Sequence, residues 1–469
     1  MSQQETLFYV SKINWERIYL NITLETEYEG IVEFKLEKIG KIFRDEEKNI
    51  IGANIKKTIP LKHYKTGKNV FMLKCNLAAL DGRNFLDNGR WRLMAVTDEC
   101  DYVCYASNEI AYHYDDYSRI FRYGGGKYAY NISFSSLTEN EEYLWFLINS
   151  YFVKRNDKWK KRHYIEEANT KKGRKKRIKM VIAINLMKVF YQVLEHLFPK
   201  KGKNILLMSE TKDYLWGNLL YIDKRLKERG LDSKFKISYS FRKAVGNHMS
   251  AISWAKTIFL IAKQDYVFVD DYVPIFGFLN LNKRTKLIQV WHAGVGFKSV
   301  GYSRFGKVGT PFPVGSCHKK YDYALISSKK LTEVYAEVFG IEDEAFLPVG
   351  MPRLDGFLDK DKISGFRKKF FGVHPTLEGK KIILFAPTFR GKGQKTAYYD
   401  YNWLDLKEIY EFCGNEYIFL IKMHPFVSSP IEIPEEYCDR IMDFAAYPNI
   451  NDLYYITDIL ITDYSSNYF

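Results

Sequence analysis

Apolar and polar residues alternate in short runs over residues 6–115 of the chain. In segments 17–24 and 30–36, apolar side chains recur at about every second position, and Gly, Asn and Asp separate one run from the next. A period of two places successive side chains on opposite faces of a strand. The pattern therefore predicts an antiparallel β domain over residues 1–120.

Residues 140–202 show a helical pattern instead, with Leu, Phe, Lys and Arg at helical spacing and few turn-forming residues. We expect two helical segments that join at Lys171-Lys172-Gly173. In the second segment, 178–198, the polar residues form one narrow stripe and leave a broad apolar face; they are Asn185, Lys188, Gln192 and Glu195. The pattern predicts a helical linker over residues 140–202.

From residue 203 onward, apolar runs alternate with helical patterns. We expect nine strands, at residues 205–208, 235–239, 266–269, 287–290, 323–326, 345–349, 382–385, 417–421 and 459–462. Strands that alternate with helices build parallel sheets covered on both faces. Nine strands suggest two such sheets, joined near residues 335–350. The sequence therefore predicts an α/β fold with domains at 203–340 and 341–469.

Composition supports a folded chain of several domains. Of the 469 residues, 46% are hydrophobic and 16% are aromatic, enough apolar surface to offset chain entropy by burial. The formal charge is +15, and residues 154–179 hold 13 Lys or Arg against three acidic residues, a local +10. Most of the net positive charge therefore lies in this one segment, so an anionic partner is expected to bind the segment rather than the whole protein surface.

Three interpretations of this basic segment are possible. A basic run beside an amphipathic helix fits a peripheral anchor on an anionic membrane surface. A solvated linker whose apolar face packs on the following domain explains the pattern equally well. Nucleic-acid binding fits less well, because only Trp159 and Tyr164 supply stacking rings, and we expect no nucleic-acid partner.

The remaining sequence signals favour a cytoplasmic protein. The six cysteines are scattered, and the one close pair, Cys100 and Cys104, has no second pair to complete a zinc site. The N-terminus lacks the basic and apolar signature of a signal peptide, and no apolar run reaches the length of a membrane span. We expect a peripheral protein at the cytoplasmic face of the membrane.

Polar residues follow five of the expected strands, in segments 291–298, 350–355, 386–390, 422–425 and 462–466. In parallel sheets, ligands bind beyond the carboxyl ends of the strands. Arg353 and Arg390 offer forked donors to phosphate oxygens, and Ser465 and Ser466 open a helix whose N-terminus suits an anion. His292 follows its strand closely, which suits a general base. The other candidates are His424, Thr388, Lys298, Lys422, Asp355 and Asp463.

Each signal also has a structural interpretation. A single histidine at a strand end is more often structural than catalytic, and Asp-Tyr-Ser-Ser is commonly a helix N-cap. The repetition of polar residues at the same end of successive strands favours a phosphate site. We expect no metal and no cofactor, because neither an acidic cluster nor a His-x-x-x-His spacing occurs.

Five motifs together resemble the CDP-glycerol glycerophosphotransferase family, which includes the glycerol phosphate and ribitol phosphate transferases and polymerases of teichoic acid synthesis. The motifs are WHAGVGFKSVGYSRFG (291–306), GMPRLD (350–355), ILFAPTFRG (383–391), IKMHP (421–425) and YPNINDLYYITDILITDYSS (447–466). The resemblance covers about residues 203–469. It implies a GT-B architecture of two Rossmann-like domains with no metal requirement. Because relatives continue further, we expect the second of these domains to be incomplete.

The resemblance also implies roles. His292 would activate the acceptor hydroxyl, and His424, Arg353 and the Ser465-Ser466 turn would bind the donor pyrophosphate. The implied reaction transfers glycerol phosphate from CDP-glycerol to a lipid-linked teichoic acid or capsule-type acceptor and releases CMP. CDP-ribitol is the alternative donor. A glycan-binding or scaffold protein with an inactive transferase domain is the alternative of another class.

Overall fold

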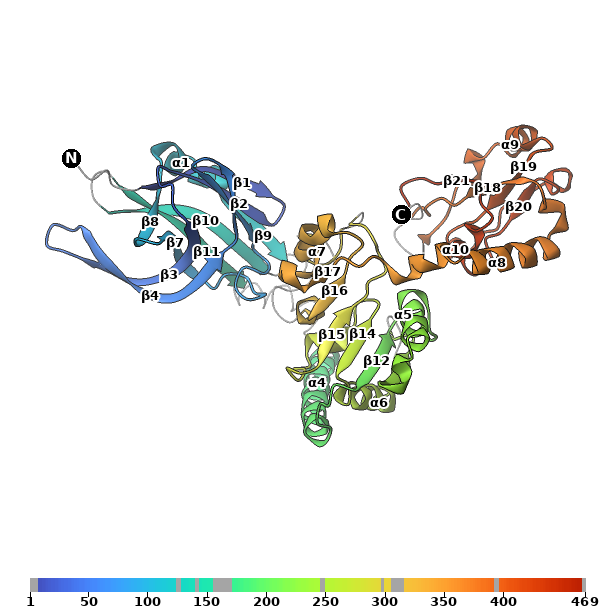
Figure 1. The fold of residues 1–469 in the computed structure, drawn as a ribbon, viewed down its shortest axis with the longest axis horizontal. Helices are drawn as coiled ribbons and strands as arrows, with labels where there is room; N and C mark the ends of the chain where they lie inside the picture. Colours follow the sequence, from blue (N-terminus) through green and yellow to red (C-terminus); the bar gives the residue numbers. More distant parts are fainter. Residues whose placement is uncertain are drawn as a thin grey trace. The chain divides into compact units, whose positions relative to one another are not determined.

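The structure is a computed structural model that describes residues 7–123, 128–139, 143–154, 171–244, 249–296, 299–304, 316–391 and 396–465. The chain divides into two compact units, Met1–Met351 and Pro352–Phe469 (Figure 1). The first unit contains a β domain and an α/β domain, and the second unit contains another α/β domain. Each unit is described by itself below.

The β domain is one eleven-stranded sheet in which almost all neighbouring strands are antiparallel. Its order is β4-β3-β7-β11-β8-β1-β2-β6-β5, with β10 pairing β11 and β9; β1 and β8 pair in parallel. The strands are β1 (Phe8–Glu16), β2 (Tyr19–Thr26), β3 (Val32–Arg44), β4 (Ile50–Leu61), β5 (His63–Gly67), β6 (Val70–Asn76), β7 (Gly89–Thr97), β8 (Asp101–Ala106), β9 (Arg119–Tyr123), β10 (Tyr128–Thr138) and β11 (Leu144–Lys154), with short helices α1 (Asn108–Tyr112) and α2 (Tyr114–Tyr117).

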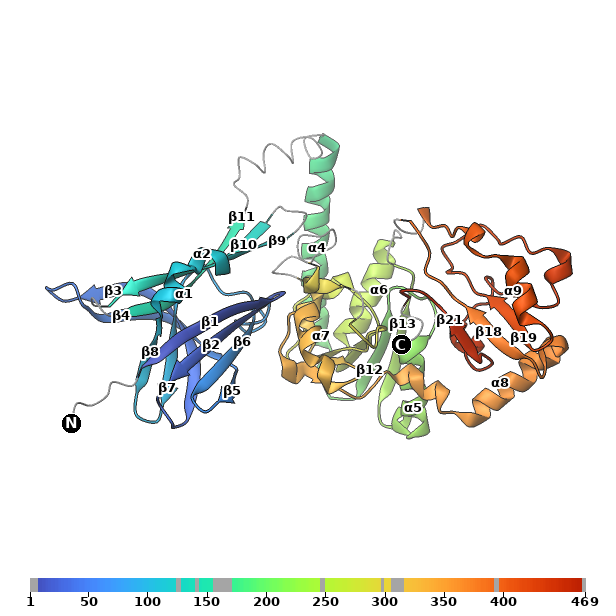
Figure 2. The same ribbon diagram turned by 90° about the horizontal axis from the view of Figure 1, so that it is seen from above.

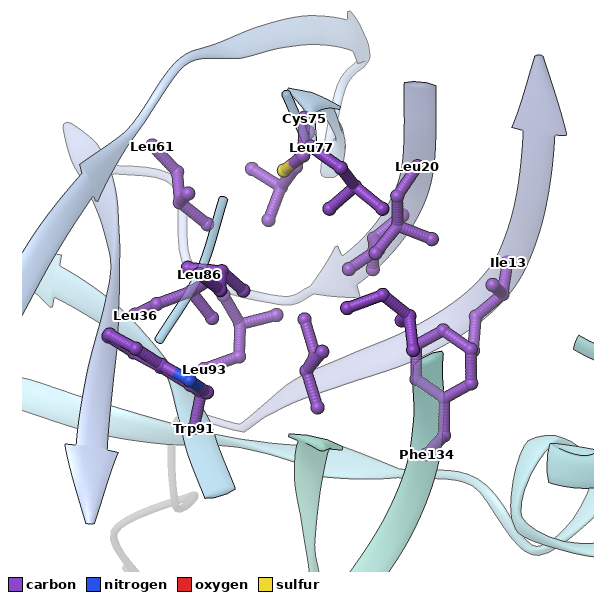
Figure 3. Packing of buried hydrophobic residues seen from close by; sticks show 14 of the residues in the cluster. Ile13, Leu20, Leu36, Leu61, Cys75, Leu77, Leu86, Trp91, Leu93 and Phe134 are labelled. Carbon is purple, nitrogen blue, oxygen red and sulfur yellow. The ribbon is translucent and has the colours of Figure 1, made fainter. Parts of the chain in front are cut away.

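Alternate strand residues fill the core of this domain. Leu20, Leu36, Leu93 and Trp91 are at most 1% exposed and converge there with Phe134 (Figure 3). The indole N–H of Trp91 donates to the Ser150 hydroxyl at 3.0 Å, so the polar edge of the ring is satisfied. The alternation of buried and exposed positions along these strands matches the period-two pattern of the sequence.

The β domain extends beyond residue 120, where the sequence placed its end. Strands β9, β10 and β11 continue the sheet to Lys154, and β10 pairs with β11 from Tyr128–Lys154 to Thr138–Leu144. The expectation of a helix over residues 144–154 is wrong. Residues 145–148 are all at most 3% exposed, so this strand is apolar on both faces. Such a continuous run does not reveal its period, which is why it reads as a helix.

Helix α4 (Lys171–Leu197) is a single helix that begins where two segments were expected to join. The rest of the expected first segment, residues 155–170, lies outside the described residues. Tyr191 and Leu194 pack α4 against α6 (Ala251–Ala262), and the two helices lie side by side in Figures 1 and 2. The rest of the apolar face is 39–65% exposed and is called the α4 apolar stripe; it consists of Ile178, Val181, Ile182, Leu186, Val189, Phe190, Val193 and Leu197.

The first α/β domain has a parallel sheet of order β13-β12-β14-β15-β16-β17. Leu206 and Val267 face one buried cluster, whereas Ile205 and Leu207 face another, so both faces of the sheet are covered. The strands are β12 (Asn204–Ser209), β13 (Lys236–Phe241), β14 (Tyr266–Val269), β15 (Lys286–Gln289), β16 (Tyr323–Leu325) and β17 (Phe346–Leu347); the helices include α5 (Gly217–Glu228) and α7 (Thr332–Phe339).

The second unit has a parallel sheet of order β20-β19-β18-β21. Its elements are β18 (Lys381–Phe385), β19 (Tyr417–Ile421), β20 (Ile441–Asp443), β21 (Ile459–Ile461), α8 (Lys360–Val373), α9 (Leu406–Cys413) and α10 (Ile450–Leu453). Two separate parallel sheets confirm the expected α/β class. β17 belongs to the first sheet, so the division falls after Met351 rather than after residue 340.

Within the first unit, the β domain contacts helix α7. Arg17, in the turn between β1 and β2, lies 2.8 Å from the fully buried Glu337 carboxylate. Burial raises the pKa of Glu337 to about 7, although Arg17 opposes the shift. The Tyr19 hydroxyl donates to the Glu333 carbonyl at 2.9 Å. These polar contacts bind the β domain to helix α7.

Candidate functional site

His292 lies beyond the carboxyl end of β15, on a turn with unusual backbone geometry. Trp291, which precedes it, has φ +34° and is 5% exposed. A bulky residue adopts this left-handed conformation only when its surroundings enforce it. The Gln289 side chain accepts from the Trp291 N–H at 2.9 Å, and the Asn218 amide donates to the carbonyls of Val290 and Trp291. These hydrogen bonds therefore fix the backbone position of His292 at the carboxyl end of β15.

The His292 ring is exposed and held at one nitrogen. Its Nδ1–H donates to the backbone carbonyl of Asp270 at 3.3 Å, and its ring centroid lies 4.6 Å from that of Trp291. With the proton on Nδ1, the lone pair of neutral imidazole is on Nε2. His292 is thus arranged to accept a proton at Nε2, as a general base must.

Asp270 is a site residue that sequence reasoning missed. It directly follows β14, next to β15 in the sheet, so its position relative to its strand resembles that of His292. Burial raises the pKa of Asp270 to about 6. Its Oδ1 atom has no hydrogen-bond partner among the residues that the structure describes. The Asp-Asp pair at a strand end was the signal that could have identified it.

The motif after His292 packs tightly against α7. The Tyr335 hydroxyl donates to the Ala293 carbonyl, and the Ser327 hydroxyl donates to the Gly294 carbonyl. Gly301 has φ +53°, and a Cβ there would overlap the Val338 carbonyl oxygen. Glycine is therefore required at this position for both conformation and space. The candidate Lys298 lies outside the described residues.

In the second unit, Thr388 and Asp463 join the ends of β18 and β21. The backbone N–H of Thr388 donates to Asp463 Oδ1 at 2.9 Å, and its hydroxyl donates to the same atom at 2.7 Å. Arg390 lies 3.0 Å from Asp463 Oδ2. Burial would raise the pKa of Asp463, but the bonds from Thr388 and Arg390 outweigh it, so that pKa lies below its usual value.

Arg390 is surrounded by aromatic rings as well as paired with Asp463. Its guanidinium carbon lies 5.0 Å from the Tyr464 ring centroid, 5.3 Å from that of Trp403 and 5.7 Å from that of Tyr399. Its Nη1–H donates to the Thr388 carbonyl at 2.5 Å and its Nη2 pairs with Asp463, so stacking, hydrogen bonding and ion pairing together hold the guanidinium plane. Arg390 is therefore a preorganised donor rather than a mobile surface cation.

His424 and Lys422 follow β19. The Phe426 N–H donates to His424 Nδ1 at 3.1 Å, so Nδ1 is the acceptor and Nε2 carries the proton. The rings of Phe389 and Phe426 lie 4.7 and 4.6 Å from the His424 ring centroid. Lys422 is 6% exposed and donates to the Ala445 carbonyl at 2.7 Å, and burial lowers its pKa. His424 is arranged as a donor, whereas Lys422 has a structural role.

The remaining candidates also lie in the second unit. Arg353 belongs to the 3₁₀ turn η7 (Pro352–Phe357), and burial lowers its pKa although Tyr454 opposes the shift. Asp355 in the same turn is exposed, and Ser465 is 9% exposed. Ser466 lies outside the described residues. The structure therefore groups Asp270 with His292 in the first unit, and Thr388 and Arg390 with Asp463 in the second.

Two further findings concern the described residues as a whole. No group of three or more His, Cys, Asp or Glu side chains in the described ranges is arranged to hold a metal ion. None of the helices in that part of the chain is long and apolar enough to cross a bilayer.

The chain is an α/β protein with two parallel sheets, and histidine, arginine and hydroxyl side chains lie at the carboxyl ends of their strands, where such folds bind ligands. The sequence profile of one family, described as CDP-Glycerol:Poly(glycerophosphate) glycerophosphotransferase, matches residues 189–469. The chain belongs to this family. The resemblance of the five motifs is thereby confirmed.

Relatives with described activities include two ribitol-phosphate polymerases. The teichoic acid ribitol-phosphate polymerase TarL of Staphylococcus aureus is 29% identical over 98% of this chain and 84% of its own length. The teichoic acid poly(ribitol-phosphate) polymerase of Bacillus spizizenii is 37% identical over 58% of this chain, which spans 43% of that protein. Among solved structures, the wall teichoic acid polymerase TagF matches 62% of this chain and 73% of its own, with 21% identity and a TM-score of 0.47.

Proposed function

We propose that the chain transfers a polyol phosphate from a CDP-polyol to a hydroxyl group of a teichoic acid acceptor and releases CMP. The observation that carries this proposal is the geometry of His292. Its Nδ1–H is engaged by the Asp270 carbonyl at 3.3 Å, which leaves Nε2 as the acceptor of the hydroxyl proton. Membership of the glycerophosphotransferase family supports the same reaction.

The reaction is a displacement at phosphorus. The acceptor hydroxyl gives its proton to His292 Nε2 while its oxygen attacks the phosphorus that bears the polyol. The bond from that phosphorus to the bridging oxygen breaks, and the electron pair leaves with CMP. Positive groups that face the departing phosphate stabilise its developing charge.

We assign donor binding to the second unit. His424 presents Nε2–H, because its Nδ1 accepts from the Phe426 N–H at 3.1 Å. Arg390 is oriented by Asp463, and Arg353 and Ser465 add a cation and a hydroxyl. Forked and charge-assisted donors of this kind suit a pyrophosphate. The proposal thus assigns the base to the first α/β sheet and donor binding to the second, which is the division of roles that a GT-B fold implies.

Ribitol phosphate is the transferred group that the relatives favour. TarL, which aligns with 98% of this chain, is named a ribitol-phosphate polymerase, and so is the relative with 37% identity. Glycerol phosphate, which the motifs suggested first, is retained as the second candidate because the family description names it. The two donors differ only in polyol length, so pocket residues rather than the phosphate ligands decide between them.

The test compares CMP release from CDP-ribitol and CDP-glycerol with a teichoic acid acceptor. His292→Ala is expected to lower turnover by about 100- to 10,000-fold, the usual value of a general base, while donor affinity measured by calorimetry is kept. His113→Ala, at an exposed position between helices α1 and α2 of the β domain, is the matched control. Undiminished turnover in His292→Ala, or no CMP release from either donor by the unaltered chain, would contradict the proposal.

We further propose that the chain acts at an anionic membrane surface on its cytoplasmic face. The α4 apolar stripe is exposed, and residues 154–179 carry a local charge of +10 in the sequence. An apolar stripe beside basic residues binds anionic bilayers by combining burial with charge. A lipid-linked acceptor would then be within reach.

Flotation with vesicles tests this second proposal. The unaltered chain is expected to float with phosphatidylcholine vesicles that contain phosphatidylglycerol, and the double variant Leu186→Ser and Val193→Ser is expected to lose that binding. Ile31→Ser and Ile51→Ser, at exposed positions of the β domain, form the matched control. Equal flotation of the two double variants would exclude the α4 apolar stripe as the contact.

A further inference from the structure

A cavity of about 460 Å³ lies at the amino end of the first parallel sheet. Asn204 begins β12 and Lys236 begins β13, while Lys263 and Gln264 lead into β14. All three strands run in parallel, so their amino ends lie at the edge opposite to His292 and Asp270. The cavity is therefore separate from the proposed catalytic site. Its lining includes Phe198, Lys201, Asn204, Lys236, Lys263 and Gln264.

Three lysines give the cavity a positive charge. Within the described part of the chain, no carboxylate lies within 4 Å of the ammonium groups of Lys201, Lys236 or Lys263. The Lys263 ammonium lies 4.0 Å from the Phe259 ring centroid and 4.7 Å from that of Phe198. These rings hold the charge in place without neutralising it. Three cations in one cavity favour an anion.

The carboxylate of Asp265, which follows Gln264 in the chain, is bound at one oxygen, whereas its Oδ1 has no hydrogen-bond partner among the described residues. Asp265 Oδ2 accepts from the backbone N–H groups of Lys203 and Asn204, both at 2.9 Å, and from the Asn204 amide at 3.1 Å. These bonds outweigh burial and keep the pKa of Asp265 below its usual value. Asp265 therefore fixes the start of β12 through Oδ2, and in the described part of the chain it makes no ion pair with the three lysines that line the cavity.

The neutral side chain of Gln264, in the lining, indicates that the ligand also carries a hydrogen-bond donor. Gln264 is 2% exposed, and its Nε2 donates to the Leu260 carbonyl at 2.9 Å. Its Oε1 has no hydrogen-bond partner among the described residues. A buried acceptor without a partner is costly unless a donor reaches it. A ligand hydroxyl would supply that donor, while the three lysines bind an anionic group.

We propose that this cavity binds a phosphate ester of a polyol, with the phosphate at Lys201, Lys236 and Lys263 and a hydroxyl near Gln264. This goes beyond the proposed transfer reaction, because the site lies at the opposite edge of the sheet. Two sources share this chemistry: the headgroup of an anionic phospholipid and a soluble polyol phosphate. The α4 apolar stripe ends at Leu197, next to Phe198 in the lining, so acyl chains have an apolar surface beside the cavity.

Acetylation of individual lysines, followed by mass spectrometry, tests the proposal on the full chain. Glycerol 3-phosphate and dioctanoylphosphatidylglycerol are the probes, and dioctanoylphosphatidylcholine is the zwitterionic control. At probe concentrations about ten times the dissociation constant, acetylation of Lys201, Lys236 and Lys263 is expected to slow by about tenfold, because the bound phosphate shields their ammonium groups. Lys224, Lys256 and Lys368, which do not line the cavity, are expected to react unchanged.

Protection by phosphatidylglycerol alone identifies a lipid headgroup, and protection by both probes at similar concentrations identifies a soluble ester. In the variant Lys236→Gln and Lys263→Gln, protection of Lys201 is expected to require about tenfold more probe. Lys224→Gln with Lys256→Gln is the control of equal charge, and circular dichroism checks that both variants fold. Unchanged acetylation of the three cavity lysines, or equal protection of the control lysines, overturns the proposal. CMP release is not a readout, so this result is independent of the transfer reaction.

Discussion

Thr388 donates two hydrogen bonds to one oxygen of Asp463, at 2.9 Å from its backbone N–H and 2.7 Å from its hydroxyl. The two residues follow β18 and β21, which are neighbours in the sheet although 75 residues separate Thr388 from Asp463. The second oxygen of Asp463 lies 3.0 Å from Arg390. Asp463 thus positions the loop that carries Arg390, and Thr388 is already engaged by protein rather than open to a phosphate.

Asp463→Asn is expected to destabilise the chain by about 1–3 kcal/mol at pH 7, because it removes the charge from these bonds. The pKa of Asp463 lies below its usual value, so the carboxylate stabilises the fold above about pH 4 and that contribution is lost as pH falls through its lowered pKa. Urea unfolding at several pH values measures the difference. Asp439→Asn, at an exposed carboxylate, is the control; equal losses in both variants would exclude the role of Asp463.

The two histidines are expected to be opposite tautomers when neutral. His292 donates from Nδ1 to the Asp270 carbonyl, whereas His424 accepts at Nδ1 from the Phe426 N–H. Proton–nitrogen correlation spectra of the chain labelled with ¹⁵N-histidine, recorded over a pH series, distinguish the two neutral forms. His292→Ala and His424→Ala assign the signals. A shared tautomer would contradict the separate roles of base and donor.

The sequence predicted the two parallel sheets well because their strands are short apolar runs between helical patterns. Residues 266–269 and 417–421 are strands with the predicted bounds. The prediction failed where the pattern lost its period or was too short. Residues 145–148 are apolar on both faces of β11, and β20 has only three residues, Ile441–Asp443. Local pattern thus predicts short apolar strands that lie between helical patterns, but not a long apolar run without a visible period, such as β11.

The candidate residues were recognised from their places after strands, but their partners were not. The pairing of Arg390 with Asp463 depends on β21 lying beside β18, and strand order is a tertiary property that one sequence does not reveal. The same holds for Asp270, which meets His292 only because β14 and β15 are neighbours. The sequence therefore predicts which side chains lie at the ends of the strands. It does not predict the contacts that orient them, because these contacts depend on the order of the strands in the sheet.

Gly301→Ala is expected to destabilise the first unit by several kcal/mol. Its φ of +53° is strained for alanine, and the new Cβ would overlap the Val338 carbonyl oxygen. Gly365→Ala is the matched control, since this glycine lies inside α8 and its Cβ would meet open space. Alanine there is expected to stabilise by about 0.5–1 kcal/mol through helix propensity. Thermal unfolding measures both variants, and a Gly301→Ala chain as stable as the original would refute the close packing on α7.

Asp270→Asn is expected to change stability in the opposite sense to Asp463→Asn. Burial raises the pKa of Asp270 to about 6, so the folded chain favours the protonated carboxyl. The contribution of Asp270 to stability is therefore present below about pH 4 and is lost as pH rises through 6.

Because asparagine does not ionise, Asp270→Asn should gain on the order of 2 kcal/mol relative to the unaltered chain between pH 4.5 and pH 8. Urea unfolding at these two pH values measures the gain, and Asp271→Asn is the neighbouring control. The backbone carbonyl that orients His292 is kept in both variants, so the His292 tautomer should not change. If the effect of Asp270→Asn on stability did not vary with pH, the Asp270 carboxylate would be solvated in the folded chain. That result would contradict the burial of this carboxyl beside His292.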